Sequence, residues 1–227
     1  MTIEIRPRFV SFDLYGTLID YEYDTNVRRI LGDRLPPDLV DQFELAGEAI
    51  RFDEVMGDWK PYHEVIARSL RRTMEKFGIE YRDADGRQAY EAIGTFEPYP
   101  DVPRALARLA DHYPLVILSN ADDAQIADNV ARLGVPLHAV ITAEQARAYK
   151  PRLAAFEHML GALGAGPDEI VHVSSSPMYD HRPAQDVGIT NKVLMDRGWE
   201  PDQPWLSYVR IRDIADLPAV LGAGAGV

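Results

Sequence analysis

The chain has 227 residues, a formal net charge of −12 and no cysteine. This length can bury a sizeable core, either as one domain or as a domain with an insertion. The lack of cysteine excludes a disulfide framework, a thiolate nucleophile and a thiolate metal site. The acidic charge argues against a nucleic-acid partner, because phosphate binding needs a basic surface, although one pocket can still attract anions.

The first eight residues, Met1–Arg8, lack the continuous apolar run of a signal peptide. Elsewhere no apolar stretch approaches the roughly 18 residues that a membrane span needs. We therefore expect a soluble, cytoplasmic protein that has no membrane partner.

The first predicted strand is Phe9–Phe12, an almost wholly apolar run that is typical of a strand buried on both faces of a parallel sheet. Asp13 follows it directly, at the end of the strand where open α/β sheets bind their ligands. A buried carboxylate is costly unless it is paired. A functional role for Asp13 is therefore favoured over that of a polar turn residue.

A helical pattern fills residues 18–96, where apolar residues recur at steps of three and four. One such series is Leu39, Phe43, Ala46 and Ile50. A block of this length directly after the first strand cannot be a simple crossover helix. We predict a helical cap subdomain at 18–96, inserted into an α/β core domain that consists of 1–17 and 97–227.

From Glu97 onward, strands alternate with helices. The predicted strands are Leu115–Leu118, His138–Ile141, Glu169–Val173 and Lys192–Met195. Four helices are predicted between and after these strands. The first begins after Asp101, its expected N-cap, and the second spans about 123–132. The third contains Phe156 and Leu160, and the last closes the chain from Ile214 to Leu221. This alternation predicts a Rossmann-like parallel sheet that is covered by helices on both faces.

Polar residues recur where these strands end. They are Asp13, Ser119 and Asn120, the run Ser174–Ser176 followed by Asp180, and Lys150 at the head of the helix after the third strand. The carboxyl ends of parallel strands share one rim, so we expect these side chains to converge there, under the cap.

The stretch Asp13-Leu-Tyr-Gly-Thr17 resembles the nucleophile motif of the haloacid dehalogenase (HAD) superfamily, Asp-x-Asp/Tyr-Gly-Thr. Phosphatases of the superfamily have a second Asp where this chain has Tyr15, and tyrosine is typical of the L-2-haloacid dehalogenase branch. Ser119-Asn120, Lys150 and Val173–Asp180 resemble the second, third and fourth motifs. The resemblance spans nearly the whole chain and implies the HAD fold with a helical cap.

The resemblance also implies a role for each matching residue. Asp13 would be the nucleophile that forms an ester with the substrate, and Lys150 would keep it ionised. Asp180, with Ser175, would belong to the machinery that hydrolyses the ester. The residues expected at the substrate are Tyr15, Thr17, Ser119, Asn120, Ser176 and Arg51.

Structural roles remain open for several of these residues. Ser119 or Asn120 could cap the next helix, and Thr17 could be a turn hydroxyl. Arg51 is the nearest candidate for the halide-binding arginine of the family's cap, but its position favours a solvent-facing helix residue. The fourth motif also lacks the family's asparagine, and Phe156 stands where dehalogenases have a tyrosine.

No metal or other cofactor is expected. Ser175 and Tyr15 stand where the superfamily's phosphatases have carboxylates, so few hard oxygen ligands remain for Mg²⁺. We predict a hydrolytic dehalogenase that converts short (S)-2-haloacids into (R)-2-hydroxy acids through an ester on Asp13. The alternatives are a dehalogenase-like hydrolase of another small carboxylic acid, a Mg²⁺-dependent phosphatase and a non-catalytic binding module. The resemblance further suggests a homodimer.

Overall fold

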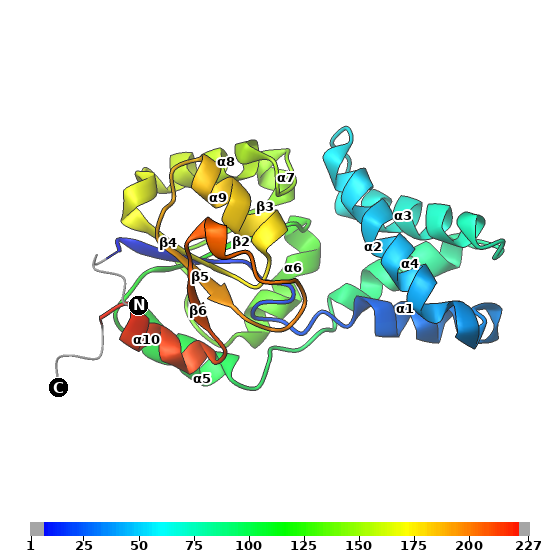
Figure 1. Cartoon of the computed structure of the whole chain (residues 1–227), viewed down its shortest axis with the longest axis horizontal. Coiled ribbons are helices and arrows are strands. Elements are labelled where there is room, and N and C mark those ends of the chain that lie inside the picture. The colour runs from blue at the N-terminus through cyan, green and yellow to red at the C-terminus, as the bar shows by residue number, and fades with distance from the viewer. Residues whose placement is uncertain (1–6, 223–227) are drawn as a thin grey trace.

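The structure is a computed structural model that describes residues 7–222 (Figure 1). Its centre is one parallel sheet of six strands in the order β3-β2-β1-β4-β5-β6. The strands are β1 (Phe9–Phe12), β2 (Leu115–Ser119), β3 (Ala139–Thr142), β4 (Ile170–Ser174), β5 (Lys192–Met195) and β6 (Val209–Ile211). All four residues of β1 are buried, and β1 lies between β2 and β4, so the residue that follows β1 lies near the middle of the sheet's carboxyl edge.

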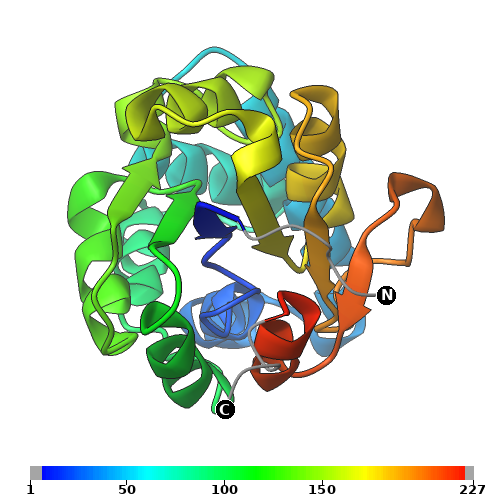
Figure 2. The same ribbon diagram turned by 90° about the vertical axis from the view of Figure 1, so that its left-hand side faces the viewer.

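Helices cover both faces of the sheet, as Figure 2 shows. Successive side chains of a strand point to opposite faces. Val10 and Phe12 therefore pack with α5, α6 and α10, while Phe9 packs with α8 and α9 on the other face. These helices are α5 (Val102–Ala110), α6 (Asp123–Arg132), α7 (Ala143–Ala146), α8 (Leu153–Leu163), α9 (Arg182–Asp186) and α10 (Leu217–Val220). The Rossmann-like fold class predicted from the sequence is confirmed.

A group of four helices lies beside the sheet, past its carboxyl edge (Figure 1). They are α1 (Tyr23–Leu31), α2 (Val40–Met56), α3 (Tyr62–Lys76) and α4 (Asp83–Ile93). The chain enters and leaves this group through two adjacent segments, which meet in a bridge between Ile19 and Pro98. Both connections therefore lie close to Asp13, and the helices face the rim on which the predicted site residues stand.

Three details differ from the sequence-based prediction. The short strand β6 was not predicted, and the closing helix α10 spans only Leu217–Val220, after a 3-10 turn at Ile214–Asp216. Asp101 does not cap α5 with its side chain. Its carboxylate instead accepts hydrogen bonds from Arg197 and from the backbone N–H of Ile214. A tertiary contact thus replaces the local cap that the sequence suggested.

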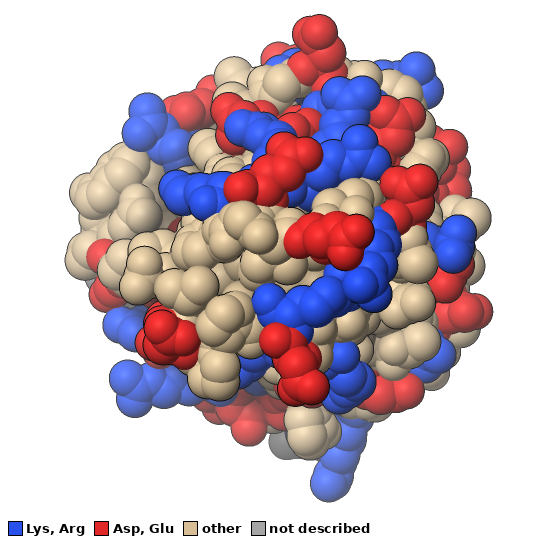
Figure 3. All heavy atoms as spheres, turned by 90° about the vertical axis from the view of Figure 1, so that its right-hand side faces the viewer, with Lys and Arg blue, Asp and Glu red and all other residues tan. Residues whose placement is uncertain are grey.

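The outer surface of the helical group carries Lys and Arg interspersed with Asp and Glu (Figure 3). The excess of acidic residues is therefore spread among basic residues on this face. Within residues 7–222, every helix is too short or too polar to span a bilayer. Most of the segment considered for a signal peptide, residues 1–6, lies outside the described part of the chain.

Candidate active site

Asp13 is held at the end of β1 by both its backbone and its side chain. Its N–H donates to the carbonyl of Val173 at the end of β4, 3.0 Å away. The Thr17 hydroxyl donates to Asp13 Oδ2 at 2.6 Å. Between the two residues the chain turns through Gly16, whose φ of 80° lies in the left-handed region that glycine adopts most readily. The tight turn thus returns Thr17 to the carboxylate four residues before it.

Lys150 bridges the two carboxylates of the site. Its Nζ lies 2.8 Å from Oδ1 of Asp13 and 2.8 Å from Oδ1 of Asp180. The third proton of the ammonium goes to the carbonyl of Leu118, at 3.0 Å. Lys150 is only 2% exposed, and a buried cation of this kind is tolerated because every donor has a partner. The structure therefore brings together Asp13, Lys150 and Asp180, as the sequence predicts.

Asn120 helps to place Lys150. Its side-chain amide donates to the Lys150 carbonyl at 2.9 Å and accepts from the Lys150 N–H at 2.7 Å. Both ends of the amide therefore bond the lysine backbone, which fixes Asn120 at the wall of the cavity above Asp13. The predicted contact between this side chain and a substrate carboxylate stays a prediction. Ser119 differs, because its buried hydroxyl has no hydrogen-bond partner within residues 7–222. That hydroxyl can bind a ligand.

The serines of the fourth motif follow β4, on the side of Asp13 that lies opposite Ser119 and β2. Thr17 Oγ1 accepts from the N–H of Ser175 at 2.9 Å and lies 3.2 Å from its Oγ. Ser176 accepts from the N–H of Tyr179 at 2.9 Å and also bonds the carboxylate of Glu200. Thr17 is fully buried and does not line the cavity, so its role is to orient Asp13 and Ser175 and not to contact a substrate as predicted.

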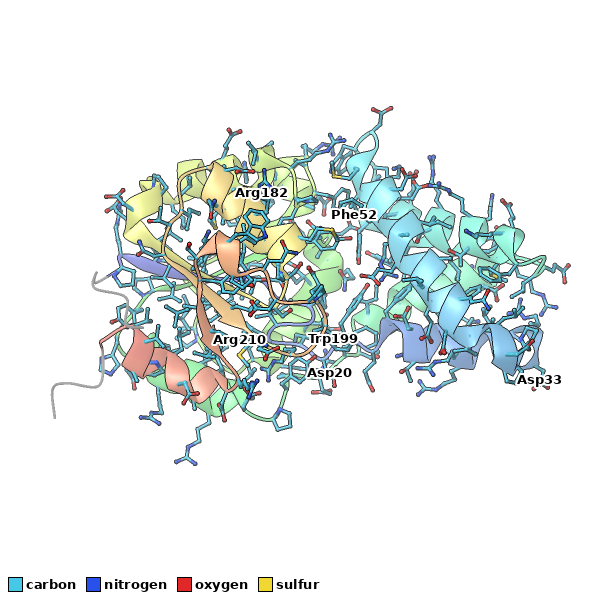
Figure 4. The ribbon with its side chains drawn as sticks, in the orientation of Figure 1. Asp20, Asp33, Phe52, Arg182, Trp199 and Arg210 are labelled. Atoms are coloured by element: carbon cyan, nitrogen blue, oxygen red, sulfur yellow. The ribbon has the colours of Figure 1, made fainter. Side chains whose placement is uncertain are left out.

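A cavity of about 230 Å³ opens above Asp13, between the sheet and the helical group. Every predicted site residue except Thr17 lines it. Residues that the sequence did not single out for it also line it, namely Tyr21, Asp24, Glu48, Val55, Tyr179, Trp199 and Glu200. Figure 4 shows Phe52 on α2 and Trp199 in the loop after β5 near the space between the two parts of the molecule. Aromatic rings therefore form much of the wall around a polar floor.

Arg51 enters this cavity from α2, and the solvent-facing position favoured by its sequence context is wrong. Its guanidinium carbon lies 4.5 Å from the centre of the Tyr23 ring and 5.9 Å from that of Tyr21. Cation–π contacts of this kind stabilise a desolvated guanidinium. Among the described residues no carboxylate forms an ion pair with Arg51. The side chain is therefore available to an anionic ligand.

Tyr15 contributes its ring to the cavity, while its hydroxyl is held elsewhere. That hydroxyl donates to Oδ1 of Asn129 at 2.8 Å and accepts from the amide of Gln125 at 2.6 Å. Both partners belong to α6. Tyr15 is thus a rigid part of the cavity wall, and its hydroxyl is already engaged.

Sequence-based prediction missed a pair of buried polar residues behind Asp180. His172 lies 2.9 Å from Oδ1 of Asp180 through Nε2, and 2.8 Å from the Ser11 hydroxyl through Nδ1. The two residues are register partners on β4 and β1. A signal was present, since Ser11 and His172 are each flanked by apolar residues on both sides within a buried strand.

Burial and charge set the ionisation of the two carboxyls. Burial raises the pKa of Asp13, and the negative charge of Asp180 adds to this, while the Lys150 ammonium opposes it. Burial would also raise the pKa of Asp180, but Lys150 and His172 outweigh burial and hold that pKa below its usual range. Burial lowers the pKa of Lys150, yet the two carboxylates raise it overall, so the lysine stays protonated. The site thus keeps Asp180 ionised more firmly than Asp13.

The donor set does not fit Mg²⁺, the metal used by the phosphatases of the fold. Both carboxylates on the floor already bond Lys150. In residues 7–222 no three His, Asp or Glu side chains are grouped so that they could hold a metal ion. Mg²⁺ prefers near-octahedral oxygen coordination. The chemistry that the floor supports is nucleophilic attack by a carboxylate next to a second, ionised carboxylate.

The fold and this site define a hydrolase of the haloacid dehalogenase kind. The model of the family described as "haloacid dehalogenase-like hydrolase" matches residues 7–188, so the chain belongs to that family. Two relatives and a solved structure are similar to it along most of its length.

The chain is 29% identical to haloacetate dehalogenase H-2 from Moraxella sp. (strain B) over 174 residues, 74% of this chain and 77% of that protein. It is 32% identical to an (S)-2-haloacid dehalogenase from Xanthobacter autotrophicus over 177 residues, 74% of this chain and 67% of that protein. The structure of an L-2-haloacid dehalogenase from Xanthobacter autotrophicus with chloropropionic acid covalently bound superposes with a TM-score of 0.77 at 22% identity. That match covers 97% of this chain and 100% of the other, and it shows the common fold.

Proposed function

We propose that this protein is a hydrolytic dehalogenase of short (S)-2-haloacids. A carboxylate oxygen of Asp13 attacks Cα of the substrate, the carbon–halogen bond breaks and the halide leaves with its electron pair. Cα is inverted and becomes linked to Asp13 through an ester. Water then hydrolyses the ester, releasing an (R)-2-hydroxy acid and one proton.

The observation that carries this proposal is a carboxylate at the floor of a cavity that also holds a cation, Arg51, which forms no ion pair with a carboxylate of residues 7–222. Asp13 is paired with Lys150, which favours its ionised, nucleophilic form. Arg51 can balance the charge of an anionic substrate or a departing halide. The unpartnered hydroxyl of Ser119 can donate to the substrate carboxylate. A small halogenated acid supplies a carboxylate and a departing halide, the two anionic groups that Ser119 and Arg51 can bind.

Asp180 suits the second step. Its Oδ1 accepts from Lys150 and His172, whereas its Oδ2 has no hydrogen-bond partner in the described part of the chain. An ionised carboxylate with one free oxygen can take a proton from water as that water attacks the ester. Ser175 lines the cavity and contacts the buried Thr17 hydroxyl, so it can orient the water or the ester carbonyl.

The helices at 18–96 act in this proposal as a cap over the core at 1–17 and 97–227. Arg51 and Tyr62 reach the cavity from the cap, which supports a role in excluding water during alkylation. A homodimer and a cytoplasmic location stay predictions. Sedimentation of the purified protein would test the first.

A second candidate is a dehalogenase-like hydrolase of another small carboxylic acid. Three carboxylates, Asp24, Glu48 and Glu200, line the cavity beside Arg51. They favour a substrate that carries a hydrogen-bond donor in addition to its acid group. A Mg²⁺-dependent phosphatase fits less well, because Lys150 already engages both carboxylates of the floor.

The test is halide release from (S)- and (R)-2-chloropropionate, measured with excess chelator for the wild type and for Asp13→Asn. Rapid release from the (S) isomer alone, lost in Asp13→Asn, is the expected result. Release that stops on addition of chelator would favour the metal-dependent alternative. No release from either isomer would refute the haloacid assignment, and a screen of other small acids would follow.

A further inference from the structure

Two polar side chains lie within the apolar layer between the sheet and α8. Ser11 and His172 are both fully buried and stand side by side in the register of β1 and β4. The ring of Phe156 meets the imidazole edge-on, with the ring centres 5.4 Å apart. Buried polar groups destabilise a fold unless they are hydrogen-bonded. The hydrogen bonds of Ser11 and His172 therefore indicate the role of this pair.

His172 links the interior of the sheet to the catalytic floor. A carboxylate only accepts hydrogen bonds, so the 2.9 Å contact to Oδ1 of Asp180 requires a proton on Nε2. On the other side of the ring, the Ser11 hydroxyl can donate to Nδ1 at 2.8 Å. Alternatively it can accept from Nδ1 and donate to the carbonyl of Val171, at 3.4 Å. Ser11 thus holds the ring in one orientation whichever atom carries the proton.

The result is an asymmetric environment for the two oxygens of Asp180. Oδ1 accepts from both Lys150 and His172, at 2.8 Å and 2.9 Å. Oδ2 is buried and has no partner among residues 7–222. Two donors on the same oxygen fix the plane of the carboxylate, because the side chain cannot rotate without breaking both bonds.

We propose that His172 is a positioning residue for ester hydrolysis, which holds Asp180 so that its free oxygen Oδ2 serves as the base. This inference rests on the proposed function, in which an ester forms on Asp13. The water oxygen bonds to Cγ of Asp13 while one water proton moves to Oδ2 of Asp180. The bond between Cγ and the ester oxygen then breaks, and that proton passes to the leaving alkoxide. Asp13 releases the second water proton as it ionises again.

The charged groups around the pair give the proposal a pH signature. Asp180 is influenced by Lys150, Asp13 and Glu200, while His172 has the imidazole of His181 and the strand partner Lys192 as neighbours. Burial raises the pKa of Asp180, and Lys150 and then His172 lower it. Loss of His172 removes one of the two residues that lower this pKa. The pKa of Asp180 should therefore rise. The acidic limb of the pH–rate profile of ester hydrolysis should then move to higher pH.

The test compares His172→Phe with His172→Gln. Phenylalanine removes the hydrogen bond, whereas the glutamine amide can still donate to Asp180. In His172→Phe we expect kcat to fall about 10- to 100-fold, less than the roughly 10²- to 10⁴-fold that a general base itself contributes. Because the slowed step follows alkylation, KM should fall together with kcat, and kcat/KM should change little. The halide burst should persist, and the ester on Asp13 should accumulate in the intact-protein mass spectrum. His172→Gln should recover most of kcat.

The matched control is His181→Gln, which removes another buried imidazole near the same floor. His181 bonds the carbonyl of Ser174, and among residues 7–222 its side chain forms no hydrogen bond to Asp180. This variant should keep the wild-type acidic limb even if its stability falls. A His172→Phe variant with the wild-type kcat, no ester accumulation and an unshifted limb would overturn the proposal.

A second readout needs no substrate and separates this inference from the proposed function. The Asp180 carboxyl can be titrated by ¹³C NMR in the wild type and in His172→Phe. A higher pKa in the variant supports the positioning role, and an unchanged pKa overturns it. If the wild type releases no halide from any 2-haloacid, the proposed function fails, and this titration still decides whether His172 controls Asp180.

Discussion

Replacing Lys150 by methionine removes the ammonium that contacts Asp13 and Asp180 at 2.8 Å each. An opposite charge at such a distance lowers a carboxyl pKa by about 1–3. Its loss should raise the pKa of Asp13, which burial already holds above its ordinary value of 3.8. At a pH below the new pKa, the ionised fraction of Asp13 falls about tenfold for every rise of about 1 in that pKa. Alkylation should therefore slow by about 10- to 1000-fold in that range and recover in part at higher pH.

The assay is the rate of the first halide release, followed by rapid mixing over a range of pH. Breaking a buried ion pair costs about 3–5 kcal/mol, so circular dichroism must first show that Lys150→Met folds. Lys192→Met is the matched control, because Lys192 is equally buried, at 2% exposed, but bonds Gln185 and not the catalytic floor. A Lys150→Met variant that releases halide at the wild-type rate, with an unshifted acidic limb, would refute the reasoning.

Two further predictions concern Arg51 and His181. Arg51→Met should lower kcat/KM about 10- to 150-fold, because a hydrogen bond to a charged group contributes about 1.5–3 kcal/mol. Arg68→Met, on the exposed surface of α3, should have no effect, and an equal loss in both variants would contradict a role for Arg51 at the substrate. Burial lowers the pKa of His181 from 6.5 to about 3. The unfolded chain thus binds more protons between these values, so stability should fall as pH drops from 6.5 toward 3, by at most about 5 kcal/mol. Urea unfolding should show this slope in the wild type, and a His181→Gln variant with the same slope would exclude His181 as its source.

The strands that carry the site could be predicted from the sequence because they are short, predominantly apolar runs. Phe9–Phe12 and Leu115–Ser119 are buried along their whole length, and a polar residue follows or ends each run. In a parallel sheet these ends share one rim, so the pattern alone predicts that Asp13 lies near Ser119. The edge strand β6, Val209–Ile211, is short and partly exposed, so it has no comparable signal.

The cavity wall was harder to predict because it depends on how the helical group lies against the sheet. Arg51 belongs to a helix whose pattern suggests a solvent-facing position, yet α2 lies so that this side chain enters the cavity. Glu200 lies in an irregular loop with no period to interpret. His172 could have been noticed, since a histidine within Ile170–Ser174 requires a buried partner, but only the fold shows that the partners are Ser11 and Asp180.

The proposed mechanism depends above all on a covalent ester at Asp13, which water then attacks at the carbonyl carbon. A single turnover with excess enzyme in H₂¹⁸O tests it most directly, with (S)-2-chloropropionate as substrate. We predict that the heavy oxygen enters the Asp13 carboxylate, detected in the peptide that contains it, and that the first (R)-2-hydroxypropionate formed carries none. Heavy oxygen in the first product and none in the Asp13 peptide would mean that water attacks the substrate directly, and would contradict the mechanism.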